Sequence, residues 1–90
     1  MNLEIEGKVY FVSGSSSGIG LGIAKSLLNE GCRVILNGRN KENLNQVKNT
    51  LGEKYKENLL TVCGDVNKIK TLNIVKNKVT EKWGKLDGII

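Results

Sequence analysis

Short, uniformly apolar runs alternate with longer amphipathic segments along this chain, and this alternation constrains the fold more than any other feature. The short runs lack the polar positions of a solvent-facing strand, so they predict strands that are buried on both faces. These strands are expected at 8–13, 33–36, 59–63 and 86–90. The longer segments repeat apolar residues every three or four positions, which predicts helices. These helices are expected at 18–30, 41–51 and 67–83.

The resulting order, β-α-β-α-β-α-β, predicts an α/β fold. Buried strands separated by helices form a parallel sheet that carries helices on both faces. Right-handed crossovers then lead to a doubly wound, Rossmann-type sheet with the strand order 3-2-1-4. The complete fold has more strands than these four, so we interpret residues 1–90 as a single, incomplete domain.

The apolar positions also predict which helix faces are buried and where one helix ends. In the first helix, Ile19, Ile23 and Leu27 recur every four residues with Ala24 and Leu28 alongside them, and together they predict one buried helix face. The corresponding face of the third helix consists of Leu72, Val75, Val79 and Trp83. Gly52 is expected to end the second helix, because glycine is preferred just beyond a helix C-terminus.

Composition argues against several classes of function. The net charge is +5, but the lysines that produce it are dispersed over the presumed helices, which is typical of a solvated surface and not of a nucleic-acid interface. The chain has no histidine, and Cys32 and Cys63 lie in apolar segments without the spacing of metal ligands. We therefore expect no metal site, no nucleic-acid partner and two buried, reduced thiols.

The N-terminus and the apolar runs bear on localisation. The sequence MNLEIEGK contains acidic residues and lacks the basic and apolar regions of a signal peptide. No apolar run approaches the ~20 residues that span a bilayer. A cytoplasmic protein without a membrane partner is therefore expected.

The stretch VSGSSSGIGLG, residues 12–22, joins the first strand to the first helix. A helix N-terminus offers free N–H groups and the positive end of the helix dipole, which together favour an anion. Gly14 would form the turn, Gly18 would let a phosphate approach the backbone, and Gly20 would let the helix pack closely on the strand. The pattern thus predicts a site for the pyrophosphate of a dinucleotide. The alternative is a flexible turn that binds no ligand.

Three motifs, in this order along the chain, resemble those of the short-chain dehydrogenases/reductases. They are SGSSSGIGLGIA near the N-terminus, GDV at 64–66 and WGKLDGII at 83–90. The resemblance covers residues 8–90, although Ser13 stands where the family usually has threonine.

The resemblance implies a role for each matching residue. Around the pyrophosphate and ribose it places Gly14, Ser16, Ser17, Gly18, Ile19 and Gly20. Asp65, followed by Val66, would contact the adenine ring; the alternative for Asp65 is a solvated carboxylate at a strand end. Trp83 is expected in the core, and Asp87 is expected to be a turn residue and not an acid catalyst.

The end of the second strand bears on the choice between NAD and NADP. In this fold an acidic residue there accepts a hydrogen bond from the ribose 2′-hydroxyl, whereas a nearby arginine accommodates a 2′-phosphate. Here Gly38 stands at the acidic position and Arg39 follows it, which favours NADP over NAD. The alternative for Arg39 is a solvated loop residue. Ser17 is a departure, because many NADP-preferring members carry lysine or arginine at that position.

Members of the family transfer a hydride between nicotinamide and a carbonyl or hydroxyl carbon, with a tyrosine assisted by a lysine four residues later. Neither Tyr10 nor Tyr55 has a lysine at that spacing, so no catalytic residue is expected among residues 1–90.

The chain is therefore interpreted as the N-terminal, dinucleotide-binding portion of a longer oxidoreductase with a small carbonyl or alcohol substrate. The stretch VILNGRN is most similar to 3-oxoacyl-carrier-protein reductases, and a homo-oligomer is expected for the complete protein. The alternative is a stand-alone, non-catalytic half-domain that binds a nucleotide or a partner chain.

Overall fold

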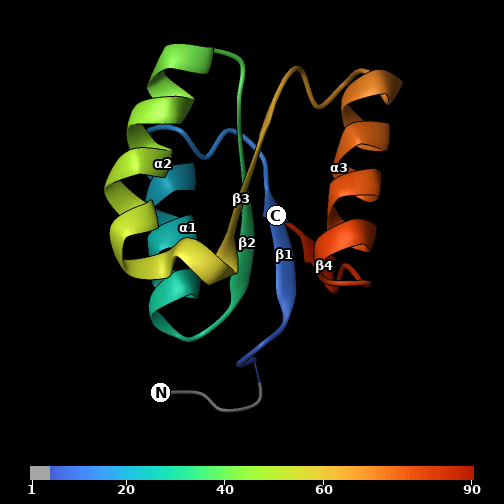
Figure 1. The fold of residues 1–90 in the computed structure, drawn as a ribbon. Helices are drawn as coiled ribbons and strands as arrows, with labels where there is room; N and C mark the ends of the chain where they lie inside the picture. The colour runs from blue at the N-terminus through green and yellow to red at the C-terminus, as the bar shows by residue number, and fades with distance from the viewer. Residues whose placement is uncertain (1–4) are drawn as a thin grey trace.

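The computed structural model describes residues 5–90 of the chain (Figure 1). Its elements, in chain order, are β1 (Val9–Val12), α1 (Gly18–Asn29), β2 (Arg33–Gly38), α2 (Lys41–Tyr55), the 3-10 turn η1 (Lys56–Asn58), β3 (Leu59–Cys63), α3 (Ile69–Lys82) and β4 (Gly88–Ile89). No helix within this described part has the length and hydropathy needed to cross a membrane.

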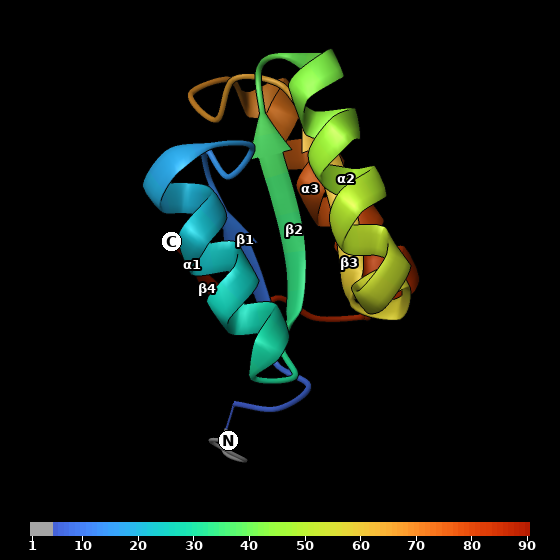
Figure 2. The same ribbon diagram turned by 90° about the vertical axis from the view of Figure 1, so that its left-hand side faces the viewer.

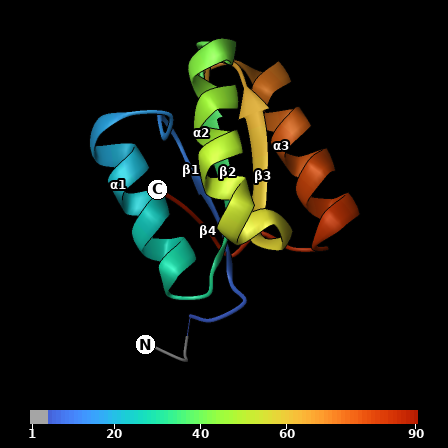
Figure 3. The ribbon, with the colours of Figure 1, turned by 60° about the vertical axis from the view of Figure 1, so that its left-hand side comes forward.

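The strands form one parallel sheet in the order β3-β2-β1-β4, which confirms the predicted Rossmann-type topology. Helices α1 and α2 lie on one face of the sheet and α3 lies on the other (Figures 1 and 3). Strand β2 lies between β1 and β3, and in Figure 2 it runs behind the gap between α1 and α2. Between β3 and β4 the chain crosses to the other face of the sheet. Strand β4 then pairs with β1 on the side opposite β2, so the strand order reverses between β1 and β4.

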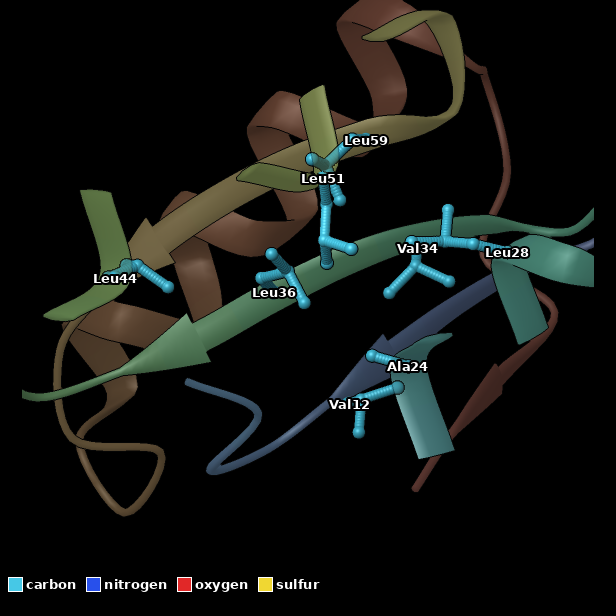
Figure 4. Packing of buried hydrophobic residues seen from close by; sticks show 8 residues of the cluster. All are labelled: Val12, Ala24, Leu28, Val34, Leu36, Leu44, Leu51 and Leu59. Atoms are coloured by element: carbon cyan, nitrogen blue, oxygen red, sulfur yellow. The ribbon is translucent and has the colours of Figure 1, made fainter. Parts of the chain in front are cut away.

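Both faces of the sheet are covered by apolar side chains, which explains why the strands are apolar throughout. The cluster between the sheet and the α1–α2 layer is shown in Figure 4 and consists of Val12, Ala24, Leu28, Val34, Leu36, Leu44, Leu51 and Leu59. The cluster between the sheet and α3 consists of Val9, Phe11, Ile35, Val62, Val75 and Val79. Trp83 is partly buried against this second cluster, in agreement with its predicted place in the core.

The inward faces of α1 and α3 agree with those expected except in the first turn of each helix. In α1, Ala24 and Leu28 are buried and Ile23 and Leu27 pack against the first cluster, but Ile19 is 85% exposed. In α3, Val75 and Val79 are buried as expected. In α3 the inward position of the first turn is taken by Thr71 and not by the exposed Leu72. Thr71 fits there because Gly64 has no side chain, and a Cβ on Gly64 would lie only 2.6 Å from the Thr71 hydroxyl oxygen.

Helix α2 continues through Gly52, so the prediction that this glycine ends the helix is wrong. Gly52 does not have a positive φ, and the helix extends to Tyr55. The ring of Tyr55 packs against the cluster beneath α1 and α2, and this contact favours the additional turn. Tertiary packing here outweighs the local preference of glycine for a helix end.

Strand β2 and helix α3 also have boundaries that differ from those expected. Strand β2 extends two residues beyond Leu36, because Asn37 and Gly38 pair in register with the last residues of β3. Helix α3 begins at Ile69, two residues later than predicted. The Asp65 side chain accepts a hydrogen bond from the Asn67 N–H at 2.9 Å, and this turn delays the helix.

The two cysteines are both free, but only one of them is buried as expected. Cys32 lies in the core, where burial raises the pKa of its thiol. Cys63 is exposed because it is the last residue of β3, where the strand leaves the sheet. Its position in an apolar run therefore did not indicate burial.

Asp87 joins the two strands at the β1–β4 side of the sheet. Its carboxylate accepts a hydrogen bond from the Val9 N–H at 2.7 Å, and its own N–H donates to the Val9 carbonyl at 2.8 Å. Lys85 forms an ion pair with the same carboxylate at 3.1 Å. The bond from Val9 is the main cause that lowers the pKa of Asp87 below its ordinary value.

We predict that Asp87→Asn removes a pH-dependent part of the stability. Because the pKa of Asp87 is lowered in the folded chain, its contribution is complete above the ordinary value of 3.8 and is lost as the pH falls through the lower, folded value. Urea unfolding of both proteins between pH 2 and pH 7 measures this. The difference between them should be largest near neutrality and should shrink in acid; a difference independent of pH would contradict the assignment.

We predict that Gly52→Ala stabilises the chain by about 0.5–1 kcal/mol, because alanine loses less conformational entropy in a helix. A Cβ at this position would meet no atom within 4 Å. The free energy of unfolding in urea is the measurement. Gly20→Ala is the matched control and should destabilise, because its Cβ would lie 2.9 Å from the Gly14 carbonyl carbon. A loss of stability in Gly52→Ala would contradict the extension of α2.

Candidate functional site

The segments that follow β1, β2 and β3 meet at one edge of the sheet, at the upper end of β2 in Figure 2. A hollow at this edge is lined by Ser13, Gly14, Asn37, Gly38, Arg39, Gly64, Asp65 and Val66. Four of these residues, Gly14, Arg39, Asp65 and Val66, were predicted from the sequence. The other predicted residues lie in the adjoining loop and the first turn of α1: Ser16, Ser17, Gly18, Ile19 and Gly20.

Two glycines give the loop between β1 and α1 its shape. Gly14 has a φ of 58° and Gly18 a φ of 59°, in the left-handed region that other residues rarely adopt. The extended Ser17 precedes the helix, but its side chain makes no capping hydrogen bond, and the first turn of α1 has no acidic residue. In α2, by contrast, the Asn40 side chain accepts a hydrogen bond from the Asn43 N–H. The start of α1 is therefore left without a side-chain cap and is suited to an anion.

Gly20 allows helix α1 to pack closely on the loop that follows β1. A Cβ on Gly20 would overlap the Gly14 carbonyl oxygen and would lie 3.1 Å from the Ser15 Cα. The absence of a side chain therefore lets the first turn of α1 pack closely against Gly14 and Ser15. The neighbouring Ile19 side chain points away from the core and is exposed.

Ser15 ties the loop to the end of β2. It is completely buried, and its hydroxyl donates a hydrogen bond to the Val12 carbonyl at 2.7 Å. The same hydroxyl accepts a hydrogen bond from the Asn37 N–H at 2.8 Å, and the Ser15 N–H donates to the Asn37 carbonyl at 2.7 Å. The loop is therefore fixed at Ser15, while Ser17, two residues further on, is exposed.

The buried Asn37 side chain connects the ends of three strands. Its amide nitrogen donates to the carbonyls of Val62 and Gly64, both at 3.1 Å, on the β3 side. Its amide oxygen accepts a hydrogen bond from the Gly14 N–H at 3.2 Å, on the β1 side. Asn37 was not among the site residues predicted from the sequence. A signal was present, because a polar residue that follows a buried apolar run needs internal partners.

Arg39 and Asp65 both line the hollow and form a long ion pair. The distance from Arg39 Nη2 to Asp65 Oδ2 is 3.8 Å, and the side chains are 77% and 30% exposed. An exposed pair of this length contributes little to stability, so the guanidinium is free to turn toward another anion. The other carboxylate oxygen of Asp65 is held by the Asn67 N–H. The structure thus brings together Arg39, which was predicted to bind a 2′-phosphate, and Asp65, which was predicted to contact adenine.

Comparison with known proteins gives consistent results. The model of the family described as short chain dehydrogenase matches residues 8–90. Ipsdienol dehydrogenase of Ips pini is 37% identical over 90 residues, all of this chain and 32% of that protein. An uncharacterized oxidoreductase of Staphylococcus saprophyticus is 33% identical over 88 residues, 98% of this chain and 38% of that protein.

A solved structure shows the same similarity. L-sorbose reductase from Gluconobacter frateurii, in complex with NADPH and L-sorbose, has a TM-score of 0.88 and 35% identity. The match covers 99% of this chain and 34% of that one. This chain therefore spans about a third of the length of the relatives it matches.

We predict that Asn37→Ala lowers the free energy of unfolding by about 1–3 kcal/mol, because it leaves buried polar groups unpaired. Asn37→Asp keeps an acceptor for the Gly14 N–H but places a carboxylate against the carbonyls of Val62 and Gly64. It should therefore destabilise at least as much as alanine at neutral pH. Urea unfolding is the measurement.

Asn49→Ala serves as the control, since Asn49 is exposed in α2 and its replacement should change stability by less than about 0.5 kcal/mol. If Asn37→Asp were as stable as the original chain, the amide would not be holding the end of β3. The connection between the three strand ends would then rest on the backbone alone.

Proposed function

The chain belongs to the short-chain dehydrogenase family, and on that premise we propose that it is the dinucleotide-binding portion of an oxidoreductase that uses NADPH. The observation that carries the proposal is the uncapped start of α1, which opens at the carboxyl edge of a parallel sheet behind two glycines of positive φ. Ligands of doubly wound folds bind at this edge, where the strand order reverses.

We assign the pyrophosphate to the loop between β1 and α1. Backbone N–H groups at the start of α1 would donate to the phosphates, and the conformations of Gly14 and Gly18 keep side chains away from this approach. Ser16 and Ser17 would add hydroxyl donors, and Ile19 and Gly20 would border the ribose and pyrophosphate. The connection through Ser15 and Asn37 supports this assignment, because it holds the loop in place before any ligand binds.

We assign the adenosine end of the cofactor to the segments after β2 and β3. Asp65 would accept a hydrogen bond from the adenine amino group, with Val66 beside the ring. Gly38 leaves the end of β2 without a carboxylate, and the exposed Arg39 guanidinium would bind a 2′-phosphate. The relative solved with NADPH supports a phosphorylated dinucleotide, with NAD as the weaker ligand.

Bound NADPH would supply a hydride for a carbonyl carbon, or NADP would accept one from an alcohol. Among residues 1–90 neither tyrosine has a lysine four residues later, so this sequence offers no positioned general acid of the kind the family uses. We propose that the acid and the contacts to a small carbonyl or alcohol substrate come from residues beyond position 90. A cytoplasmic location and a homo-oligomeric complete protein are part of the same proposal.

We predict that the chain binds NADPH more tightly than NADH by about tenfold or more, because a charge-assisted hydrogen bond contributes about 1.5–3 kcal/mol. Arg39→Gln keeps a polar side chain but removes the charge, and it should bring the two dissociation constants close together. Fluorescence titration of both cofactors against the chain measures this.

Arg33→Gln is the matched control, because Arg33 is the other arginine of the chain and lies at the start of β2, far from the hollow. It should leave the preference unchanged. Equal binding of the two cofactors, or a preference that persists in Arg39→Gln, would refute the assignment of Arg39. Failure to bind either cofactor would favour a half-domain that binds a partner chain.

A further inference from the structure

We propose that Ser16 is a specificity-determining residue, because its side chain occupies the space that any side chain at position 38 would need. The inference rests on the proposed dinucleotide site and concerns how the end of β2 is kept free of an acidic residue. It assigns part of the cofactor selectivity to a contact between the loop after β1 and the end of β2, and not to position 38 alone.

The contact is shorter than a side chain can tolerate. Gly38 is buried, and a Cβ built on it would lie 2.6 Å from the Ser16 Oγ and 2.9 Å from the Ser16 Cβ. Rotation about the Ser16 side chain would move the hydroxyl but would leave the Cβ where it is. The next nearest atom, Leu44 Cδ1, lies at 3.9 Å and would be in ordinary contact. Ser16 is therefore the obstacle.

The backbone of Gly38 does not itself require glycine. Gly38 is not among the glycines of positive φ, and it pairs in register with Cys63 as an ordinary strand residue. Gly14 and Gly18 differ, because at their positive φ another residue would be strained whatever the space around it. Glycine at position 38 is thus explained by its neighbour.

The loop cannot easily withdraw Ser16 from this place. The residue before it, Ser15, is buried and bonded to Val12 and Asn37. The first turn of α1 packs on the same loop through Gly20, with no room for an additional atom. The Cα of Ser16 is therefore held from both sides, and a side chain at position 38 would have to distort the proposed pyrophosphate site.

This arrangement predicts the effect of an acidic residue at the end of β2. Such a residue normally accepts a hydrogen bond from the ribose 2′-hydroxyl and selects NAD. Here Gly38→Asp alone should weaken both cofactors, because it displaces the loop that binds their common pyrophosphate. Removing the Ser16 side chain should free the space and let the carboxylate act.

The experiment compares Gly38→Asp with the double variant Ser16→Gly/Gly38→Asp by titration with NADH and NADPH. We expect the double variant to bind NADH about tenfold more tightly than Gly38→Asp does, and to prefer NADH over NADPH. Ser17→Gly/Gly38→Asp is the matched control and should not recover binding, since Ser17 is not among the atoms that a Cβ at position 38 would meet. A switch to NADH in Gly38→Asp alone would overturn the inference.

A second measurement needs no cofactor. Gly38→Ala should lower the urea midpoint in the original chain and should have a smaller effect in the Ser16→Gly background. Equal losses in both backgrounds would overturn the inference, whatever the chain binds. If instead the original chain bound neither cofactor while this coupling persisted, the proposed function would fail and the steric contact between Ser16 and position 38 would stand.

Discussion

Three strand ends meet at the Asn37 side chain, and the other groups of the candidate site take their positions from that meeting. Its amide reaches the Gly14 N–H on one side and two carbonyls of the β3 end on the other. The loop after β1, the turn before α3 and the exposed Arg39 are consequently arranged around one buried residue. An apolar side chain at this position would fill the space but would leave these backbone groups unpaired.

The site has a buried base, formed by Ser15 and Asn37, and a more exposed rim, formed by Arg39 and Asp65. Ser15 and Asn37 are buried and fully engaged, whereas the Arg39 guanidinium is exposed and only loosely paired with Asp65. In the proposed assignment, backbone groups near the base would bind the pyrophosphate, which NAD and NADP share. The side chains at the rim would contact the adenosine end of the cofactor, where NADP carries a 2′-phosphate and NAD does not. Under the proposed assignment, cofactor selectivity would change at the rim while the base is preserved, except where the loop touches the end of β2, at Ser16 and Gly38.

Much of the fold could be predicted because its signals are local. The alternation of strand and helix patterns, with right-handed crossovers, leads to the strand order, and the glycine spacing indicates the loop. The errors arose where distant contacts decide. Ile19 and Leu72 fit the helical period but lie one position away from the buried face. The partners of Asn37 lie 23 to 27 residues away in the sequence, so the pattern around it could not show them.

The bond between Asp87 and the Val9 N–H joins residues 78 positions apart and closes most of the chain into one loop. Closing so long a loop costs chain entropy before other contacts can repay it, so such contacts tend to form late in folding. A contact that is absent from the transition state affects the rate of unfolding more than the rate of folding. The β1–β4 junction would then contribute to the lifetime of the folded state, and the earlier, more local assembly of β1, β2 and β3 would set how quickly that state is reached.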